Sequence, residues 1–187
     1  MTTWKRGRQL VWERIRSGAM PLDKFITEIE RREPTRISGT AVYMAGNAEA
    51  APLALLHNLK HNKVLHRRVV ILTIALEDSP RVADAERIEV EKLDAGFWRV
   101  RARYGFFEEP NVGNVLARCA PHDLEFKPME TTFFLSRETV MVSGRPGGMM
   151  GWRKRLFAVL SRNATGATAY FRLPANRVVE LGMQVEI

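Results

Sequence analysis

The loop Ala45–Ala51 has the composition and position of an anion-binding site. It connects a short apolar segment, Thr40–Met44, to a helical pattern that Pro52 can open at its first turn. Free backbone N–H groups at the start of a helix attract negative charge, so Gly46 and Asn47 are candidates for binding a nucleotide or another anion. The loop lacks the complete glycine pattern of a dinucleotide site or a P-loop.

A second candidate anion site is the glycine-rich loop Gly144–Gly151, which precedes a helical pattern at Trp152–Ser161. Arg145, Arg153 and Lys154 would add positive charge to the N-terminal donors of that helix. The alternative is a loop whose glycines satisfy turn geometry and whose basic side chains are solvated. With two polar residues that follow the first loop, the predicted ligand-binding set is Gly46, Asn47, His57, Lys60, Arg145, Gly147, Gly148 and Arg153.

Other residues of catalytic or metal-binding type lack the partners that such chemistry requires. His57 and His61 have the spacing of two metal ligands on one helix face, but no carboxylate or cysteine nearby completes the set. Cys119 stands on an apolar stripe close to His122, without an evident base and orienting acid. No local motif assembles a serine triad. We therefore expect no metal site, no cofactor and no enzymatic activity.

Arg99, Arg101 and Arg103 are separated by single residues, and such a row of bases is typical of a surface that binds nucleic acid. The alternation continues on both sides of a turn signal, which predicts a β-hairpin. In that hairpin Arg99 falls opposite Glu91 and Arg101 opposite Glu89, so cross-strand ion pairs would absorb much of the charge. We expect weak, nonspecific nucleic-acid binding at most.

Size and composition suit one domain with an extension. The chain has 187 residues, of which 45% are apolar, and this is enough to bury a sizeable core. The single cysteine cannot form an internal disulfide, and the first residues lack the pattern of a signal peptide. The strongest apolar run, Val69–Leu76, is far shorter than the ~18 residues of a membrane span. These features predict a soluble cytosolic chain.

The formal net charge of +8 suggests an anionic partner. Met1–Gly18 contains five basic residues and one acidic residue, and we expect the rest of the excess to be spread over the folded body. Within this segment, Trp4, Val11, Trp12 and Ile15 lean to one side of a helix at Thr2–Arg16. Such a basic amphipathic helix suits an anionic lipid surface.

The remaining pattern predicts a layered α/β domain, with a mixed β-sheet flanked by helices, behind an N-terminal helical extension. A second helix follows Pro21, and Glu30–Ser38 has the character of a linker, so we divide the chain into residues 1–36 and 37–187. Thr40–Met44, the helix after Pro52 and the buried strand Val69–Leu76 form a βαβ unit. The later elements are the hairpin, helices at Asn111–Ala120 and Trp152–Ser161, and strands at Thr131–Leu135 and Val179–Ile187. One face of the last helix is apolar and consists of Trp152, Leu156, Val159 and Leu160.

Motifs along almost the whole chain carry a resemblance to a known family. The most distinctive is Pro52–His66, PLALLHNLKHNKVLH. The others are Thr3–Arg8, Gly39–Met44, Ala102–Phe106, Thr132–Thr139 and Leu173–Gly182. Together they resemble the cytosolic C-terminal region of Kup-type potassium uptake proteins, a family of proton-coupled potassium symporters.

The resemblance implies a regulatory or assembly domain on the cytoplasmic face of the inner membrane. Its partners would be the membrane portion of the same transporter, anionic lipid through the basic first helix, a second copy in a homodimer, and a cytosolic nucleotide. We expect Met1 to correspond to an internal position of such a transporter, and no transport residue carries over to this chain. The alternative is a freestanding nucleotide-binding or nucleotide-utilising α/β domain, which would need a general base and usually a metal site.

Overall fold

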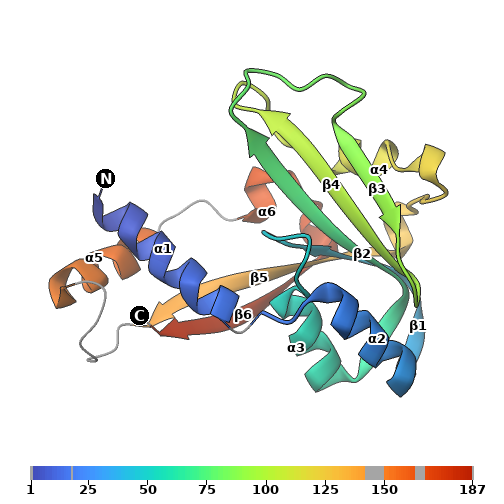
Figure 1. The fold of residues 1–187 in the computed structure, drawn as a ribbon, viewed down its shortest axis with the longest axis horizontal. Coiled ribbons are helices and arrows are strands. Elements are labelled where there is room, and N and C mark those ends of the chain that lie inside the picture. The colour runs from blue at the N-terminus through green and yellow to red at the C-terminus, as the bar shows by residue number, and fades with distance from the viewer. Residues whose placement is uncertain (1, 18, 142–149, 163–166, 187) are drawn as a thin grey trace.

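The fold is a six-stranded mixed sheet with helices on both faces, as the sequence predicts. The computed structural model describes residues 2–17, 19–141, 150–162 and 167–186. The strands lie in the order β3-β4-β2-β1-β5-β6, and β3 alone among them runs antiparallel to its neighbour (Figure 1). Their bounds are β1 (Thr35–Met44), β2 (Val64–Glu77), β3 (Ile88–Lys92), β4 (Phe97–Gly105), β5 (Thr131–Met141) and β6 (Val178–Glu186).

Four of the helices in the described residues form two pairs in space. The helix bounds are α1 (Thr2–Ser17), α2 (Leu22–Arg32), α3 (Leu53–Asn62), α4 (Val112–Ala117), α5 (Gly151–Arg162) and α6 (Ala167–Tyr170), with 3-10 turns at Ala120–His122, Pro128–Glu130 and Ala175–Arg177. Figure 1 shows α2 and α3 close together beside the sheet, and α1 and α5 together at one end of the molecule. The predicted βαβ unit is confirmed, since β1 and β2 are parallel and α3 connects them.

Alternation along the central strands forms two separate core layers. Ala41 and Tyr43 of β1 face the layer that contains α2 and α3, whereas Val42 faces the layer that contains α4. In β2, Val69 and Ile71 belong to the first layer in the same way. Both faces of these strands are therefore dry, which explains why the run beginning at Val69 is continuously apolar.

A third core cluster joins the two ends of the chain. Val11 of α1 packs with Phe157 and Ala158 of α5, and with Val140 and Val185 near the ends of β5 and β6. Each of these five side chains is buried. The predicted N-terminal extension is thus packed against elements that lie some 130 or more residues later in the sequence.

The linker predicted at Glu30–Ser38 is wrong at both ends, because α2 continues to Arg32 and β1 already begins at Thr35. Thr35 pairs with Val64, and Arg36 donates hydrogen bonds to the carbonyl oxygens of His66 and Ala95 at 2.9 and 2.8 Å. The pairing register shifts between Ile37 and Thr40, which interrupts the alternation along the strand. Local periodicity could not reveal this strand, since partners from distant segments hold it.

The predicted apolar face of α5 is present, but it does not pack against the core. Trp152, Leu156, Val159 and Leu160 are exposed, whereas Phe157 and Ala158 on the opposite side are buried. Apolar residues occur on both sides of this helix, so their spacing predicts a helix without deciding which side packs. Only the position of α1 decides it.

Candidate functional site

A cavity of about 300 Å³ opens at the carboxyl end of β1. From β1 the chain proceeds to β2 on one side of it, and later returns to place β5 on its other side. Where neighbouring parallel strands lead into segments that diverge in this way, a crevice forms beyond the strand ends, and ligands of α/β proteins commonly bind there. This cavity is therefore the candidate site.

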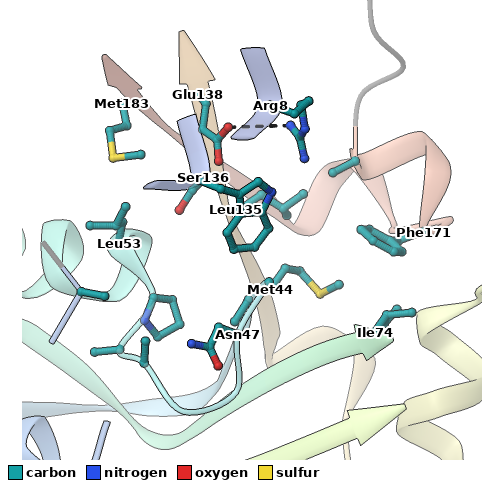
Figure 2. Close-up of a pocket in the computed structure, with 18 residues that line it drawn as sticks. Arg8, Met44, Asn47, Leu53, Ile74, Leu135, Ser136, Glu138, Phe171 and Met183 are labelled. Carbon is teal, nitrogen blue, oxygen red and sulfur yellow. Dashed lines mark ion pairs between the residues drawn. The ribbon is translucent and has the colours of Figure 1, made fainter. Parts of the chain in front are cut away.

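The walls of the cavity come from six parts of the chain. Figure 2 shows Met44 and Asn47 at one side, Leu135, Ser136 and Glu138 of β5 at another, and Arg8 beside Glu138. The remaining lining residues are Trp12, Ala19, Ala45, Gly46, Ala50, Ala51, Pro52, Leu53, Ile74, Ala167, Phe171 and Met183. Most of these side chains are apolar, so the cavity suits a compact ligand with an apolar body.

The β1–α3 loop is held in place from outside the cavity. Arg99 of β4 is buried and donates from Nε to the carbonyl oxygen of Ala48 at 3.1 Å. Leu22 at the start of α2 donates its backbone N–H to the carbonyl oxygen of Glu49 at 2.9 Å, and the loop residue Ala51 donates to that of Met20. The loop is thus a fixed wall of the cavity.

Ser136 satisfies part of the α3 N-terminus. The backbone N–H of Ala54 donates to Ser136 Oγ at 3.1 Å. The predicted attraction of an anion to this helix start is therefore weakened, because a neutral hydroxyl already accepts one of its hydrogen bonds. Asn47 Oδ1 likewise accepts from the backbone N–H of Glu49 at 3.0 Å and shapes the loop.

Arg8 and Glu138 supply the charged groups of the cavity. Their side chains approach to 3.9 Å, which is the outer limit of an ion pair (Figure 2). Burial raises the pKa of the Glu138 carboxyl above its ordinary value, and the positive charge of Arg8 partly opposes that rise. The pair can therefore respond to pH or exchange its partners for a polar group on a ligand.

The first helix closes the cavity. Arg8 and Trp12 lie one turn apart on α1 and both line it. A Cβ atom at Gly46 would come within 2.6 Å of the Trp12 ring, so the glycine permits the ring to lie directly over the loop. A ligand that fills the cavity would therefore touch α1.

The structure separates most of the predicted ligand-binding residues. Gly46 and Asn47 line the cavity, whereas His57 and Lys60 lie further along α3 and do not. Arg153 lies on α5, where its Nε donates to Thr3 Oγ1 at 3.1 Å. The other three members of the set, Arg145, Gly147 and Gly148, lie outside the described residues, so the second loop stays a prediction.

The histidine and cysteine positions can also be described. The rings of His57 and His61 lie 5.9 Å apart, and the described residues contain no group of three or more His, Cys, Asp or Glu side chains with metal-binding geometry. Cys119 is buried, as its apolar stripe predicts, and burial raises its pKa to about 11. A thiol in this state is a poor nucleophile.

The predicted pairing of the arginine row is confirmed. Arg99 lies opposite Glu91 in the hairpin and Arg101 opposite Glu89, with N–O distances of 2.7 and 3.3 Å. Arg103 approaches Glu89 at 3.6 Å. These arginines belong to ion pairs on the sheet, and their charge is largely compensated there.

Among the residues of the cavity wall that sequence reasoning missed are Arg8, Trp12, Ser136 and Glu138. One signal was available, because Ser136 and Glu138 continue the alternation of the strand predicted at Thr131–Leu135 and place polar groups on one face. For Arg8 and Trp12 no local signal exists, since only the packing of α1 brings them to this edge of the sheet.

Comparison with known proteins gives a consistent result. A family model described as "K+ potassium transporter C-terminal domain" matches residues 38–187. Three similar proteins are the "Probable potassium transport system protein Kup 2" of Chromobacterium violaceum and the "Probable potassium transport system protein Kup" of Myxococcus xanthus and of Pseudomonas savastanoi pv. phaseolicola. They are 53%, 56% and 53% identical over all 187 residues.

The chain spans less than a third of these relatives, namely 30%, 28% and 30% of their respective lengths. No solved structure matches it. Within the described residues, every helix is too short or too polar to cross a membrane.

Proposed function

Because the chain belongs to the family of K+ potassium transporter C-terminal domains, we propose that it is the cytosolic regulatory and assembly domain of a proton-coupled potassium symporter. The observation that carries this proposal is that all 187 residues of the chain match relatives named as potassium transport system proteins. The chain spans less than a third of the length of these relatives. Potassium uptake would belong to the whole transporter. The chain alone would neither transport potassium nor catalyse a reaction.

The cavity gives this domain a means of regulation. A ligand in it would touch both the fixed β1–α3 loop and the α1 residues Arg8 and Trp12. A change in α1 would then pass to the rest of the transporter, provided that the ligand binds one arrangement of α1 more tightly than another. The proposed partners are therefore the membrane portion of the same protein and a cytosolic small molecule, with a homodimer as the assembled form.

A nucleotide is the finer proposal for that small molecule. In its favour, Gly46 and Asn47 lie in a strand-to-helix loop that opens into the cavity, and Arg8 offers a positive charge there. The apolar walls would receive a base, and Arg8 would receive a phosphate. Calorimetry with a panel of nucleotides tests this, and the same heat for the chain and for Arg8→Ala would contradict it.

A filled cavity tests the regulatory role in the whole transporter. We expect Leu53→Trp, at the cavity wall, to change the rate of potassium uptake by cells that depend on this transporter, at unchanged protein abundance. Lys60→Trp is the matched control, since it introduces the same ring on the exposed side of α3 away from the cavity. If cells with Leu53→Trp and cells with Lys60→Trp both take up potassium at the wild-type rate and reach the wild-type internal potassium concentration, the proposed regulatory role of the cavity is wrong.

A further inference from the structure

The exposed face of α5 is apolar over two turns. It consists of Trp152, Leu156, Val159 and Leu160, whose spacing of four, three and one residues places them in one stripe. Their side chains are 62%, 43%, 53% and 43% exposed. Met150, directly before the helix, is also exposed. Such a stripe is larger than the single apolar residues scattered over ordinary protein surfaces.

The opposite side of α5 fixes this orientation. Phe157 is 1% exposed and lies against Trp4 of α1, with ring centroids 5.5 Å apart. A Cβ atom at Gly7 would come within 2.4 Å of the Phe157 ring, so α1 approaches α5 as closely as a glycine allows. Turning the apolar stripe inward would expose Phe157 and Ala158 and would break this close contact between α1 and α5. The stripe is therefore presented outward by the fold.

The same two helices hold all of the net charge. α1 contains five basic residues and one acidic residue, and α5 contains four basic residues and no acidic one. Together they account for the whole formal charge of +8, because the other 20 basic and 20 acidic residues cancel. The expectation that the excess outside the first segment is spread over the body is thus wrong. Figure 1 shows the two helices at one end of the molecule, so that end is basic and the rest is balanced.

The charge of this end selects among the partners that an apolar stripe can have. A second copy of the chain would bring another surface of the same positive charge against it, which is repulsive. A nucleic acid would meet the basic residues but would leave Leu156, Val159 and Leu160 in water. An anionic bilayer matches both features, because it attracts basic residues at its surface and accepts apolar side chains and tryptophan just below the headgroups.

We infer that α5 lies in the surface of an anionic lipid bilayer, with Trp152, Leu156, Val159 and Leu160 inserted and the exposed Lys5 of α1 and Arg155 of α5 at the headgroups. This deepens the proposed function, since it gives the domain a second attachment to the membrane that would hold the parent transporter. With α5 in the bilayer, the α1 wall of the cavity would lie close to the membrane. The exposed Arg155, beside Val159 on the stripe margin, is placed to meet the headgroups.

Vesicle flotation of the purified chain tests the inference directly. We expect binding to vesicles of phosphatidylcholine with about 30 mol% phosphatidylglycerol, which gives a strongly anionic surface. Binding to phosphatidylcholine alone should be weak. The double variant Leu156→Gln/Leu160→Gln should lower the partition coefficient at least about tenfold, because two inserted apolar side chains become polar. Both positions are exposed, so the fold should survive the change.

Phe107→Gln is the matched control, because Phe107 is 75% exposed in the segment after β4, away from α5. It should bind vesicles as the wild type does. Quenching of tryptophan fluorescence by brominated lipid, reduced by Trp152→Phe, would place the stripe itself in the bilayer. Urea unfolding of each variant checks that stability is retained.

Three outcomes would overturn the inference. The first is equal vesicle binding by the wild type and the double variant, which would leave electrostatic attraction alone. The second is binding that does not depend on anionic lipid. The third is a dimer in light scattering that the double variant abolishes, without vesicle binding by either protein. If Leu53→Trp changes potassium uptake but the chain does not bind vesicles, the proposed function is supported and the lipid contact is refuted. If the chain binds vesicles but Leu53→Trp leaves potassium uptake unchanged, the lipid contact is supported and the proposed role of the cavity is refuted.

Discussion

Replacing Arg99 with methionine isolates the interaction that fixes the wall of the cavity. Methionine retains the apolar stem of the side chain and removes the guanidinium. That group is buried, donates to the Ala48 carbonyl oxygen at 3.1 Å, and lies 2.7 Å from Glu91 and 3.4 Å from both Asp23 and Glu49. The change therefore leaves one buried carbonyl group without its donor and three carboxylates without their shared cation.

The carbonyl group dominates the expected cost. Ala48 is only 6% exposed, and a buried polar group that loses its partner costs about 1–3 kcal/mol. The carboxylates of Glu91, Asp23 and Glu49 are 48%, 82% and 58% exposed, so water replaces much of the lost attraction and together they add roughly 1 kcal/mol. We expect Arg99→Met to lower the free energy of unfolding by about 2–4 kcal/mol.

Arg101→Met is the matched control. Arg101 is on the same strand and pairs with Glu89 and Glu49, but its side chain is 31% exposed and donates to no buried carbonyl group in the contacts described. Its loss should cost less than about 1 kcal/mol. Urea unfolding measures both values, and hydrogen exchange of residues 46–51 should accelerate in Arg99→Met alone. Equal costs for the two variants, or unchanged exchange of the loop, would refute the argument.

Three further predictions concern Glu138 in the cavity, Glu108 beside β4, and Phe157 in the contact between α1 and α5. Burial raises the pKa of Glu138, so the contribution of its protonated carboxyl to the free energy of unfolding is complete below the ordinary value of 4.5 and is lost as the pH rises through the folded-state pKa. Unfolding measured between pH 4 and 8 should show that loss of stability in the wild type and not in Glu138→Gln. Glu108 behaves oppositely, since the Arg87 guanidinium and the Gly105 N–H lower its pKa to about 2; acid titration should show stability lost between pH 4.5 and 2, and Glu108→Gln should not show that loss. Phe157→Ala should cost about 3–5 kcal/mol and release α1, which limited proteolysis would detect as early cleavage within residues 2–17; an intact α1 would contradict the packing described.

Several elements could be predicted from the sequence because their cause is local. The apolar run beginning at Val69 predicts a strand that is buried on both faces. The alternation on either side of Asp94–Gly96 predicts the hairpin and its register. The pairing of Arg99 with Glu91 follows from that register alone. A period of two and a tight turn leave few alternatives.

Other elements could not be predicted because their partners lie far away in the chain. Thr35–Ser38 has no apolar periodicity and is a strand only because β2 pairs with it. Of the candidate residues, Gly46 and Asn47 could be placed at the cavity from the sequence, because a strand-to-helix loop is itself a local feature. The spacing of His57 and Lys60 identifies a helix face, but it does not say which face turns to the cavity.

The sequence by itself determined the α/β class, the core strands and the family to which the chain belongs, since composition, periodicity and long identical stretches are properties of the chain in order. The tertiary structure decided what the termini do. Packing of Phe157 against α1 turns one apolar side of α5 inward and the other outward, and it brings two basic segments together at one end. Those facts depend on contacts between residues about 150 positions apart, which no local pattern encodes.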